Sequence, residues 1–404
     1  MPLRPPAGFR SAFYDPLKVA DAPTIGTATA GDAQATVEFT APSNVGGAAI
    51  TQYYAVSNPN QTTGNAASSP VTVTGLTNGT AYTFRVWALN SFGPSPYSAA
   101  TGSISPVGTR GLFGGGSSGS QTNVIQYITI SSTGNALDFG DLTGDSYSTG
   151  MVSCSSTTRA VWRYGSTVST SLVYSTINTL GNATAFGDLT VARSVNTSFS
   201  NSTRGLFAGG STNPGNNTID YITIATTGTA TDFGDTTFAY WSGSGACASS
   251  TRGIVEAAGI QSGSTEVNTV DYVTIATTGN AVNFGQLTQK RYNLGGCSSD
   301  VRGIFGGGFS DAGGVFVNTI DYITIATTGN GIDFGDLTIS RSSLAACSSK
   351  IRGVFGGGIV TGAVRQNVMD YVTIASTGNA TDFGDLLTAT SNLAACSSGH
   401  GGLS

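Results

Sequence analysis

Short runs in which apolar and polar residues alternate recur along most of the chain. In the run DYITIA at 321–326, β-branched and aromatic residues alternate with polar ones, and a Thr-Gly-Asn turn follows. An alternation with period two, rich in Ile, Val, Thr and Tyr, is typical of β-strands with one buried face. No segment carries a sustained period of 3.6 residues. The pattern therefore predicts an all-β protein.

The strand-like runs belong to a repeat. An arginine that opens a run of the type RGIF stands at positions 110, 159, 204, 252, 302 and 352, with spacings of 49, 45, 48, 50 and 50. Each copy contains four strand-like pieces: the RGIF run, the DYITIA run, a piece around Asp-Phe-Gly, and a run of the type SLAACS. Four short strands in a repeat of this length predict the blade of a β-propeller.

The array of repeats is split between its two ends. It starts with the RGIF-type run at Arg110 and finishes with SNLAACSS at 391–398, which no further RGIF-type run follows. The last strand should therefore pair beside residues 110–115 and complete the first four-stranded sheet, which removes a free sheet edge. We expect residues 108–404 to form a six-bladed propeller closed by this C-terminal strand.

The order of residues within each copy resembles that of kelch repeats. The family pattern combines an Arg and small residues in one strand, an aliphatic-aromatic strand that ends in Gly-Gly, and a closing aromatic residue. In one copy these are Arg341, Ala345, Ala346, Phe355, Gly356, Gly357, Tyr371 and Phe383. Phe replaces the usual closing Trp, at positions 139, 186, 233, 284, 334 and 383. The resemblance covers 109–404 and implies a propeller that binds other molecules.

Residues 22–107 have a different texture and resemble a fibronectin type III domain. Val37 and Phe39 alternate along one expected strand, and the segment NSFGPS at 90–95 matches the penultimate loop of the family. Leu76 precedes Tyr82 by six residues, which matches the tyrosine corner, where the phenol tethers a loop to the strand. The usual Trp of the second strand is missing, and we expect Val37 or Phe39 in its place.

Residues 1–21 are expected to form an extended arm. Prolines at 2, 5, 6 and 16 oppose a helix, and the arm lacks the apolar stretch of a secretory signal. The aromatic residues Phe9, Phe13 and Tyr14 are candidates for anchoring the arm to a larger particle. The alternative interpretation is a disordered tail.

Composition and charge restrict the chemistry. Charged residues make up 10% of the chain, the net charge is −5, and Lys and Arg together number 17, so a broad basic surface for nucleic acid is not expected. A single His excludes a multi-His metal site, including the copper site of kelch-type galactose oxidases. No apolar run approaches 18 residues. We expect no enzyme activity, no cofactor and no metal.

Residues that recur in every copy are expected to be structural. The repeat arginines, the Asp of the DY pair (in four of the six copies) and the Asp residues around DFGD should form ion pairs within or between blades, and a ring-shaped anion or calcium site is the alternative. The five cysteines, Cys154, Cys247, Cys297, Cys347 and Cys396, stand at one position of the repeat, with Phe199 in the remaining copy. This pattern predicts small buried residues near the propeller axis, without a disulfide framework or metal spacing.

Residues that break the repeat are the best candidates for recognition. Arg163 and Tyr164 replace glycines of the second copy, and Tyr240 and Trp241 replace an Arg-Ser pair in the third. Variable loops follow the RGIF-type strand, and they carry Phe309, Phe316 and Arg365. These loops should share one face, where a rigid scaffold would present them to a ligand. The alternative is neutral variation in solvated loops.

The combination resembles structural proteins of tailed bacteriophages, whose repeats read like YITIATTGNAxDFGDL. We therefore expect a virion protein of the tail or fibre, made in the host cytoplasm, whose propeller binds a host-surface glycan or protein. The arm and the fibronectin domain would attach it to other virion proteins. A capsid or neck decoration protein without receptor binding is the first alternative, and a bacterial surface adhesin is the second. A homo-oligomer, in which the chain binds a second copy of itself, is left open by the sequence.

Overall fold

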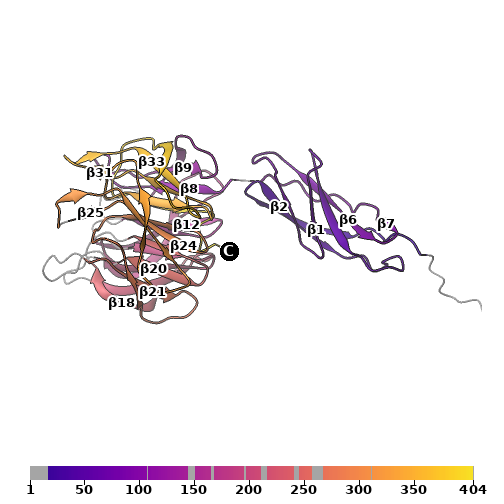
Figure 1. Ribbon diagram of the computed structural model, residues 1–404, viewed down its shortest axis with the longest axis horizontal. Helices are drawn as coiled ribbons and strands as arrows, with labels where there is room; N and C mark the ends of the chain where they lie inside the picture. The colour runs from indigo at the N-terminus through magenta and orange to yellow at the C-terminus, as the bar shows by residue number, and fades with distance from the viewer. Residues whose placement is uncertain are drawn as a thin grey trace, which may run out of the picture. The chain divides into compact units, whose positions relative to one another are not determined.

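The computed structural model describes residues 17–106, 108–143, 151–164, 168–194, 197–210, 216–240, 245–256, 267–310 and 312–403. The chain divides into two compact units, Met1–Gly108 and Thr109–Ser404. Both are built of β-strands (Figure 1), and the described ranges contain no α-helix, which confirms the all-β prediction. Accordingly, these ranges include no helix long and apolar enough to cross a membrane.

The first unit contains two antiparallel sheets. Strands β1, β2 and β5 form one sheet, and strands β4, β3, β6 and β7 form the other, in those orders. Their bounds are β1 (Thr24–Gly31), β2 (Gln34–Thr40), β3 (Gln52–Asn58), β4 (Thr63–Ala66), β5 (Val71–Thr74), β6 (Thr83–Asn90) and β7 (Gly93–Pro94).

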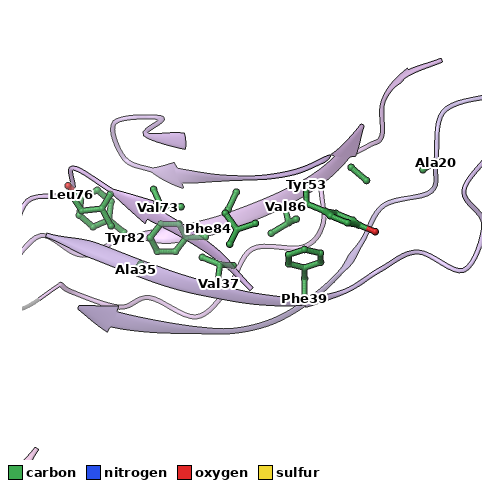
Figure 2. Packing of buried hydrophobic residues seen from close by; sticks show 13 residues of the cluster. Ala20, Ala35, Val37, Phe39, Tyr53, Val73, Leu76, Tyr82, Phe84 and Val86 are labelled. Carbon is green, nitrogen blue, oxygen red and sulfur yellow. The ribbon is translucent and has the colours of Figure 1, made fainter. Parts of the chain in front are cut away.

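The core of this unit lies between the two sheets. Figure 2 shows Phe39 of β2 facing Tyr53 of β3, with ring centroids 4.6 Å apart. Val37 is also fully buried, beside Phe84 and Val86 of β6. These positions alternate with exposed ones along each strand, as a half-buried sheet requires. Val37 and Phe39 are therefore both part of this core.

Tyr82 closes the end of the core near Leu76, opposite Ala20 (Figure 2). Its phenol oxygen accepts a hydrogen bond from the Thr77 backbone N–H at 3.1 Å and one from Asn60 Nδ2 at 3.3 Å. The bond from Thr77 lowers the pKa of Tyr82. The tyrosine-corner prediction is therefore confirmed.

The segment after β7 is held to β6 by a ladder of hydroxyl groups. The Oγ atoms of Ser95, Ser98 and Thr101 each accept a hydrogen bond of 2.9 Å, from the backbone N–H groups of residues 88, 86 and 84. The backbone N–H groups of the same three residues donate back to the carbonyls of 88, 86 and 84. The backbone hydrogen-bonding groups along this edge of β6 are therefore satisfied by residues three apart in the sequence, whereas a regular β-strand would supply residues two apart.

The second unit contains six antiparallel sheets of four strands, here numbered one to six. In sheet one the order is β35 (Ala394–Ser397), β8 (Arg110–Gly114), β9 (Val124–Thr129) and β10 (Leu137–Asp141). Sheet two contains β11 (Val152–Ser155), β12 (Arg159–Arg163), β13 (Ser169–Thr176) and β14 (Thr184–Arg193). Sheet three contains β15 (Thr197–Ser200), β16 (Arg204–Gly210), β17 (Asn216–Thr223) and β18 (Thr231–Tyr240).

The other three sheets follow the same order. Sheet four contains β19 (Ala246–Ala248), β20 (Arg252–Glu256), β21 (Thr269–Thr274) and β22 (Val282–Gln286). Sheet five contains β23 (Gly295–Ser298), β24 (Arg302–Gly306), β27 (Thr319–Thr324) and β28 (Ile332–Asp336). Sheet six contains β29 (Ala345–Ser348), β30 (Arg352–Gly356), β33 (Val368–Thr373) and β34 (Thr381–Asp385). Two hairpins are added, β25 (Phe309–Ser310) with β26 (Val315–Phe316), and β31 (Ile359–Val360) with β32 (Val364–Arg365).

Sheet one combines the two ends of the repeat array. Ala394 lies opposite Gly114 and Ser397 opposite Gly111, so β35 pairs with β8 as the split array predicts. The first strand named for each sheet (β35, β11, β15, β19, β23 and β29) is called its inner strand below. Each inner strand contacts the inner strands of the neighbouring sheets, and β35 contacts both β29 and β11.

The same contacts recur between successive sheets. Asn182 Oδ1 of sheet two accepts a hydrogen bond of 3.0 Å from the backbone N–H of Asp141 in sheet one. Asn135 of sheet one accepts the same bond, also 3.0 Å, from Asp385 of sheet six. Because equivalent atoms meet at both junctions, sheet six packs on sheet one as sheet one packs on sheet two.

Candidate functional site

Among the described residues, three buried ion pairs each join an arginine ahead of an inner strand to the third strand of the sheet that this inner strand begins. Arg193 contacts Asp220 at 2.8 Å, Arg291 contacts Asp321 at 3.1 Å, and Arg341 contacts Asp370 at 2.9 Å. All six side chains are fully buried. Burial lowers the pKa of each arginine, and the partner carboxylate opposes that shift. Since each charge is matched inside the fold, these groups are structural.

The arginines of the RGIF-type runs do not take part in those pairs, and our expectation for them is wrong. Arg352 lies over the ring of Tyr371, 4.3 Å from its centroid, and donates to the Ile130 carbonyl at 3.0 Å. All six copies place this arginine over a tyrosine. Side chains alternate between the two faces of a strand, so Tyr371 and its neighbour Asp370 point to opposite faces. Arg352 lies on the same face of sheet six as the ring of Tyr371, and there its guanidinium reaches the Ile130 carbonyl of sheet one.

The five cysteines are buried and free, in accord with the small buried residues predicted at this position. Four of the five thiols pack toward a glycine of the adjoining sheet; the Sγ of Cys347, for example, lies 2.5 Å from the place of a Cβ at Gly111. Burial raises the pKa of Cys297 and of Cys396 to about 12. The thiols therefore stay protonated and inert as nucleophiles at neutral pH.

The inner strands of all six sheets line a central cavity of about 60 Å³. Its wall consists of Ser, Ala, Gly and Cys residues, with Phe199 from sheet three and His400 from the end of the chain. Ligand pockets for small organic molecules measure roughly 300–1,000 Å³. The cavity has room for a few water-sized groups and is too small for a sugar ring.

Serine hydroxyls link the inner strands around this cavity, in a set called the serine relay below. Each hydroxyl donates to the carbonyl of the equivalent residue in the preceding sheet. The bonds run from Ser155 to Ser397 (2.7 Å), Ser200 to Ser155 (2.8 Å), Ser298 to Ala248 (2.7 Å), Ser348 to Ser298 (2.7 Å) and Ser397 to Ser348 (2.5 Å).

The hairpin β25–β26 carries a cluster of aromatic rings. Phe309 lies 5.8 Å from Tyr292 and 5.0 Å from Phe316 between ring centroids, edge to face in both cases. Two backbone hydrogen bonds join Phe309 to Tyr292, which precedes β23. The three rings are half-buried, and the adjacent Val315 is 48% exposed. This cluster is an aromatic surface with a fixed geometry.

The hairpin β31–β32 occupies the equivalent place in sheet six. Ile359 pairs with Ser342 ahead of β29, as Phe309 pairs with Tyr292 ahead of β23. Arg365 Nη2 donates to Ser117 Oγ of sheet one at 3.1 Å. In Figure 1 the strands β25 and β31 lie on the same side of the second unit, away from the C-terminal end of the chain.

The other residues predicted to contact a ligand do not lie on these two hairpins. Arg163 is fully buried and donates to the Arg193 carbonyl at 2.5 Å, so the expectation of an outward contact is wrong for this residue. Burial lowers its pKa to about 10, which still leaves a cation at neutral pH. Tyr164 is half-buried against the core of sheets one and two. The backbone of Tyr240 pairs with Asn216.

Trp241 and the arm residues Phe9, Phe13 and Tyr14 lie outside the described residues. Tyr292 was not predicted from the sequence as a recognition residue. Its signal is that an aromatic residue stands in the loop before β23, where the equivalent loop of sheet six has Ser342. The serine relay was also not predicted; its signal is a Ser directly after the cysteine position of every inner strand except β19, with Phe199 at that position in β15. Within the described ranges, no group of three or more His, Cys, Asp and Glu residues is arranged to hold a metal ion.

The first unit has the architecture of a two-sheet β-sandwich domain. Residues 21–103 match the family model of the fibronectin type III domain, and this stretch is such a domain. The match agrees with the buried core, with the Tyr82 corner and, within a few residues, with the expected bounds of 22–107. A comparison of the whole chain with curated proteins finds no match.

Proposed function

We propose that residues 109–404 form a six-bladed, kelch-like propeller that serves as a recognition module. The pairing of β35 with β8 and the equivalent contacts from sheet six to sheet one support a ring of six sheets. The buried ion pairs, the arginines stacked on tyrosine rings and the inert thiols give structural roles to many of the recurring charged and reactive groups. This assignment favours binding over catalysis.

The observation that carries the proposal is the contrast between the repeated sheets and the hairpins. Strands β24 and β30 are nearly identical in sequence, but the hairpins that follow them present Phe309 and Phe316 in one case and Val364 and Arg365 in the other. A rigid scaffold that carries variable loops is a common arrangement for recognition. Aromatic rings with an apolar face suit either a sugar face or a protein surface. The ligand proposed is a host-surface glycan or protein.

We place the protein in a bacteriophage virion, as a tail or fibre component. The low charge and the Gly-, Ser- and Thr-rich repeats suit an extracellular particle, and the five free, buried cysteines suit assembly in a reducing cytoplasm. Anchoring to the particle would use the fibronectin domain and the arm. Leu17, near the last residues of the arm, is 66% exposed, and Phe92 of the domain is 45% exposed; Asn90 hydrogen-bonds to the backbone of both segments.

The test uses particles that contain this chain and the host cells to which they adsorb. Labelling with antibody and gold should place the protein on the tail, and an excess of the purified full chain should block adsorption. The double variant Phe309→Ala and Phe316→Ala should lose most of this block. The control Ile351→Ala changes a 70% exposed side chain on a turn between β29 and β30 and should block as the unchanged chain does.

Label spread over the head, together with no block of adsorption, would overturn receptor binding. That result would instead favour the decoration protein. If the label is on the phage tail but the double variant blocks adsorption as well as the Ile351→Ala control does, the contact with the host lies outside the aromatic cluster.

A further inference from the structure

The serine relay is interrupted at a single one of its six positions. Ser298 donates to the carbonyl of Ala248, but Ala248 has no hydroxyl with which to donate to the carbonyl of Ser200. Residues Gly399–Leu403, called the tail below, pass over this point. A Cβ atom at Gly402 would lie 2.0 Å from the Ser200 carbonyl oxygen, so the backbone of the tail is packed directly on it.

His400 joins the tail to sheets two and three. Its Nε2 atom lies 3.4 Å from the Ser155 carbonyl oxygen and 3.3 Å from Ser200 Oγ. Its Nδ1 atom accepts a hydrogen bond of 3.1 Å from the N–H of Gly402, which fixes the turn of the tail. The imidazole therefore lines the end of the central cavity and has polar partners on both ring nitrogens.

The glycines join the tail to the other side of the cavity. Gly401 donates its N–H to the Ser298 carbonyl of sheet five at 3.0 Å. Gly399 forms a β-bridge with Ser349, directly after β29 of sheet six, and its backbone lies against Thr109, directly before β8 of sheet one. Together with His400, these contacts connect the tail to five of the six sheets.

The fit of the tail is specific for glycine at two consecutive positions. A Cβ atom at Gly401 would lie 2.0 Å from the Ser299 carbonyl oxygen, and one at Gly402 would lie equally close to that of Ser200. Both neighbours are backbone atoms of packed sheets and cannot move aside as a flexible side chain would. Gly401, Gly402 and Leu403 are all buried. The sequence His-Gly-Gly-Leu is therefore matched to a built surface.

We propose that the end of the cavity formed by Ser155, Ser200 and Ser298 is a binding site for a glycine-rich peptide, occupied in this chain by its own tail. The bound tail acts as a staple across the sheets, because it contacts residues that meet only when the sheets are assembled. A ligand that binds the folded state alone stabilises it by RT ln(1 + [L]/Kd), so the stability rises with the ligand concentration. The proposal rests on these contacts and does not depend on recognition by the hairpins.

The test compares the full chain with a chain that lacks residues 399–404. The deletion should lower the Tm of the second unit by several degrees. A synthetic peptide of residues 399–404 added to the shortened chain should raise the Tm progressively with its concentration. The same peptide with Gly401→Ala should leave the Tm unchanged, because its methyl group collides with the Ser299 carbonyl. An unchanged Tm after the deletion, or equal rescue by both peptides, would overturn the proposal.

A second measurement covers the case in which the shortened chain does not fold. In the full chain, the Gly401 amide should exchange slowly with deuterium, at a rate similar to that of the inner strands. The variant Gly402→Ala should raise that rate and lower the Tm, whereas Ile351→Ala should do neither. Fast exchange of the Gly401 amide in the unchanged chain would show that the tail is not held and would refute the site.

Discussion

The thiol of Cys347 fills the space above Gly111: its Sγ atom lies 2.5 Å from the position that a Cβ atom at residue 111 would take. The two residues are far apart in the sequence and belong to sheets six and one. The same relationship joins Cys247 to Gly303 at 2.4 Å and Cys297 to Gly353 at 2.8 Å. Five of the six RGIF-type runs have this glycine, and in each of the five a side chain of a different sheet occupies the place of its Cβ atom; the run at Arg159 has Ala160.

This contact predicts that Gly303→Ala destabilises the second unit. The added methyl group must displace the Cys247 thiol within a packed interface, which costs about 1–3 kcal/mol. Urea unfolding monitored by a probe of the second unit would measure the loss. Ile351→Ala is the control in the same unit, because its side chain is 70% exposed and its truncation should change the stability little. Equal effects of both substitutions would contradict the packing.

The buried pair of Arg341 and Asp370 predicts a large effect of removing one partner. Asp370→Ala leaves an uncompensated guanidinium in the core and should lower the free energy of unfolding by about 3–5 kcal/mol. The double variant Arg341→Met and Asp370→Leu should lose less than the single one, since no charge stays buried. As a control, Asp300→Asn removes an exposed pair with Lys350 and should cost less than about 1 kcal/mol. A small loss for Asp370→Ala would refute the pairing.

The tyrosine corner predicts a loss of stability in the fibronectin domain on Tyr82→Phe. The change leaves the Thr77 N–H and the Asn60 amide without their acceptor, at a cost of about 1–2 kcal/mol. Thermal unfolding of this domain would report the loss. Tyr97→Phe removes the hydroxyl from a side chain that is 53% exposed, so its Tm should match that of the unchanged chain.

His400 predicts a pH-dependent term in the stability of the second unit. Burial disfavours the imidazolium and lowers the pKa of His400 to about 4. The unfolded chain, with a pKa of about 6.5, then binds more protons than the folded chain between these values. Stability from this group therefore falls as the pH falls from about 6.5 to about 4, by at most about 3 kcal/mol.

Carboxylates also titrate in this range, so the measurement is a difference. Unfolding free energies of the unchanged chain and of His400→Gln would be compared near pH 7 and near pH 5. The unchanged chain should lose more stability than the variant between the two conditions. Parallel curves would show that His400 titrates as freely in the folded chain as in the unfolded one.

A large part of the fold could be predicted from the sequence alone, because strand alternation, repeat spacing and short motifs are visible in the order of the residues. Period-two alternation in runs such as DYITIA is enough for strands, since side chains of a strand point to alternate faces. The repeat spacing and the split at 391–398 were enough to pair β35 with β8. Leu76 and Tyr82 identified the corner of the fibronectin domain, because a motif of fixed spacing closes one loop.

Only the tertiary structure decided which partners meet between sheets. Arg352 takes Tyr371 and the Ile130 carbonyl rather than an aspartate, because the faces of its strand and the adjoining sheet determine what lies within reach. Arg163 replaces a glycine in the repeat, and nothing local indicates that its side chain folds inward onto the Arg193 carbonyl. The site of the tail depends on Ser155, Ser200 and Ser298, which come together only when three sheets pack around one cavity. Contacts of this kind depend on distances between sheets, and a single sequence does not contain those distances.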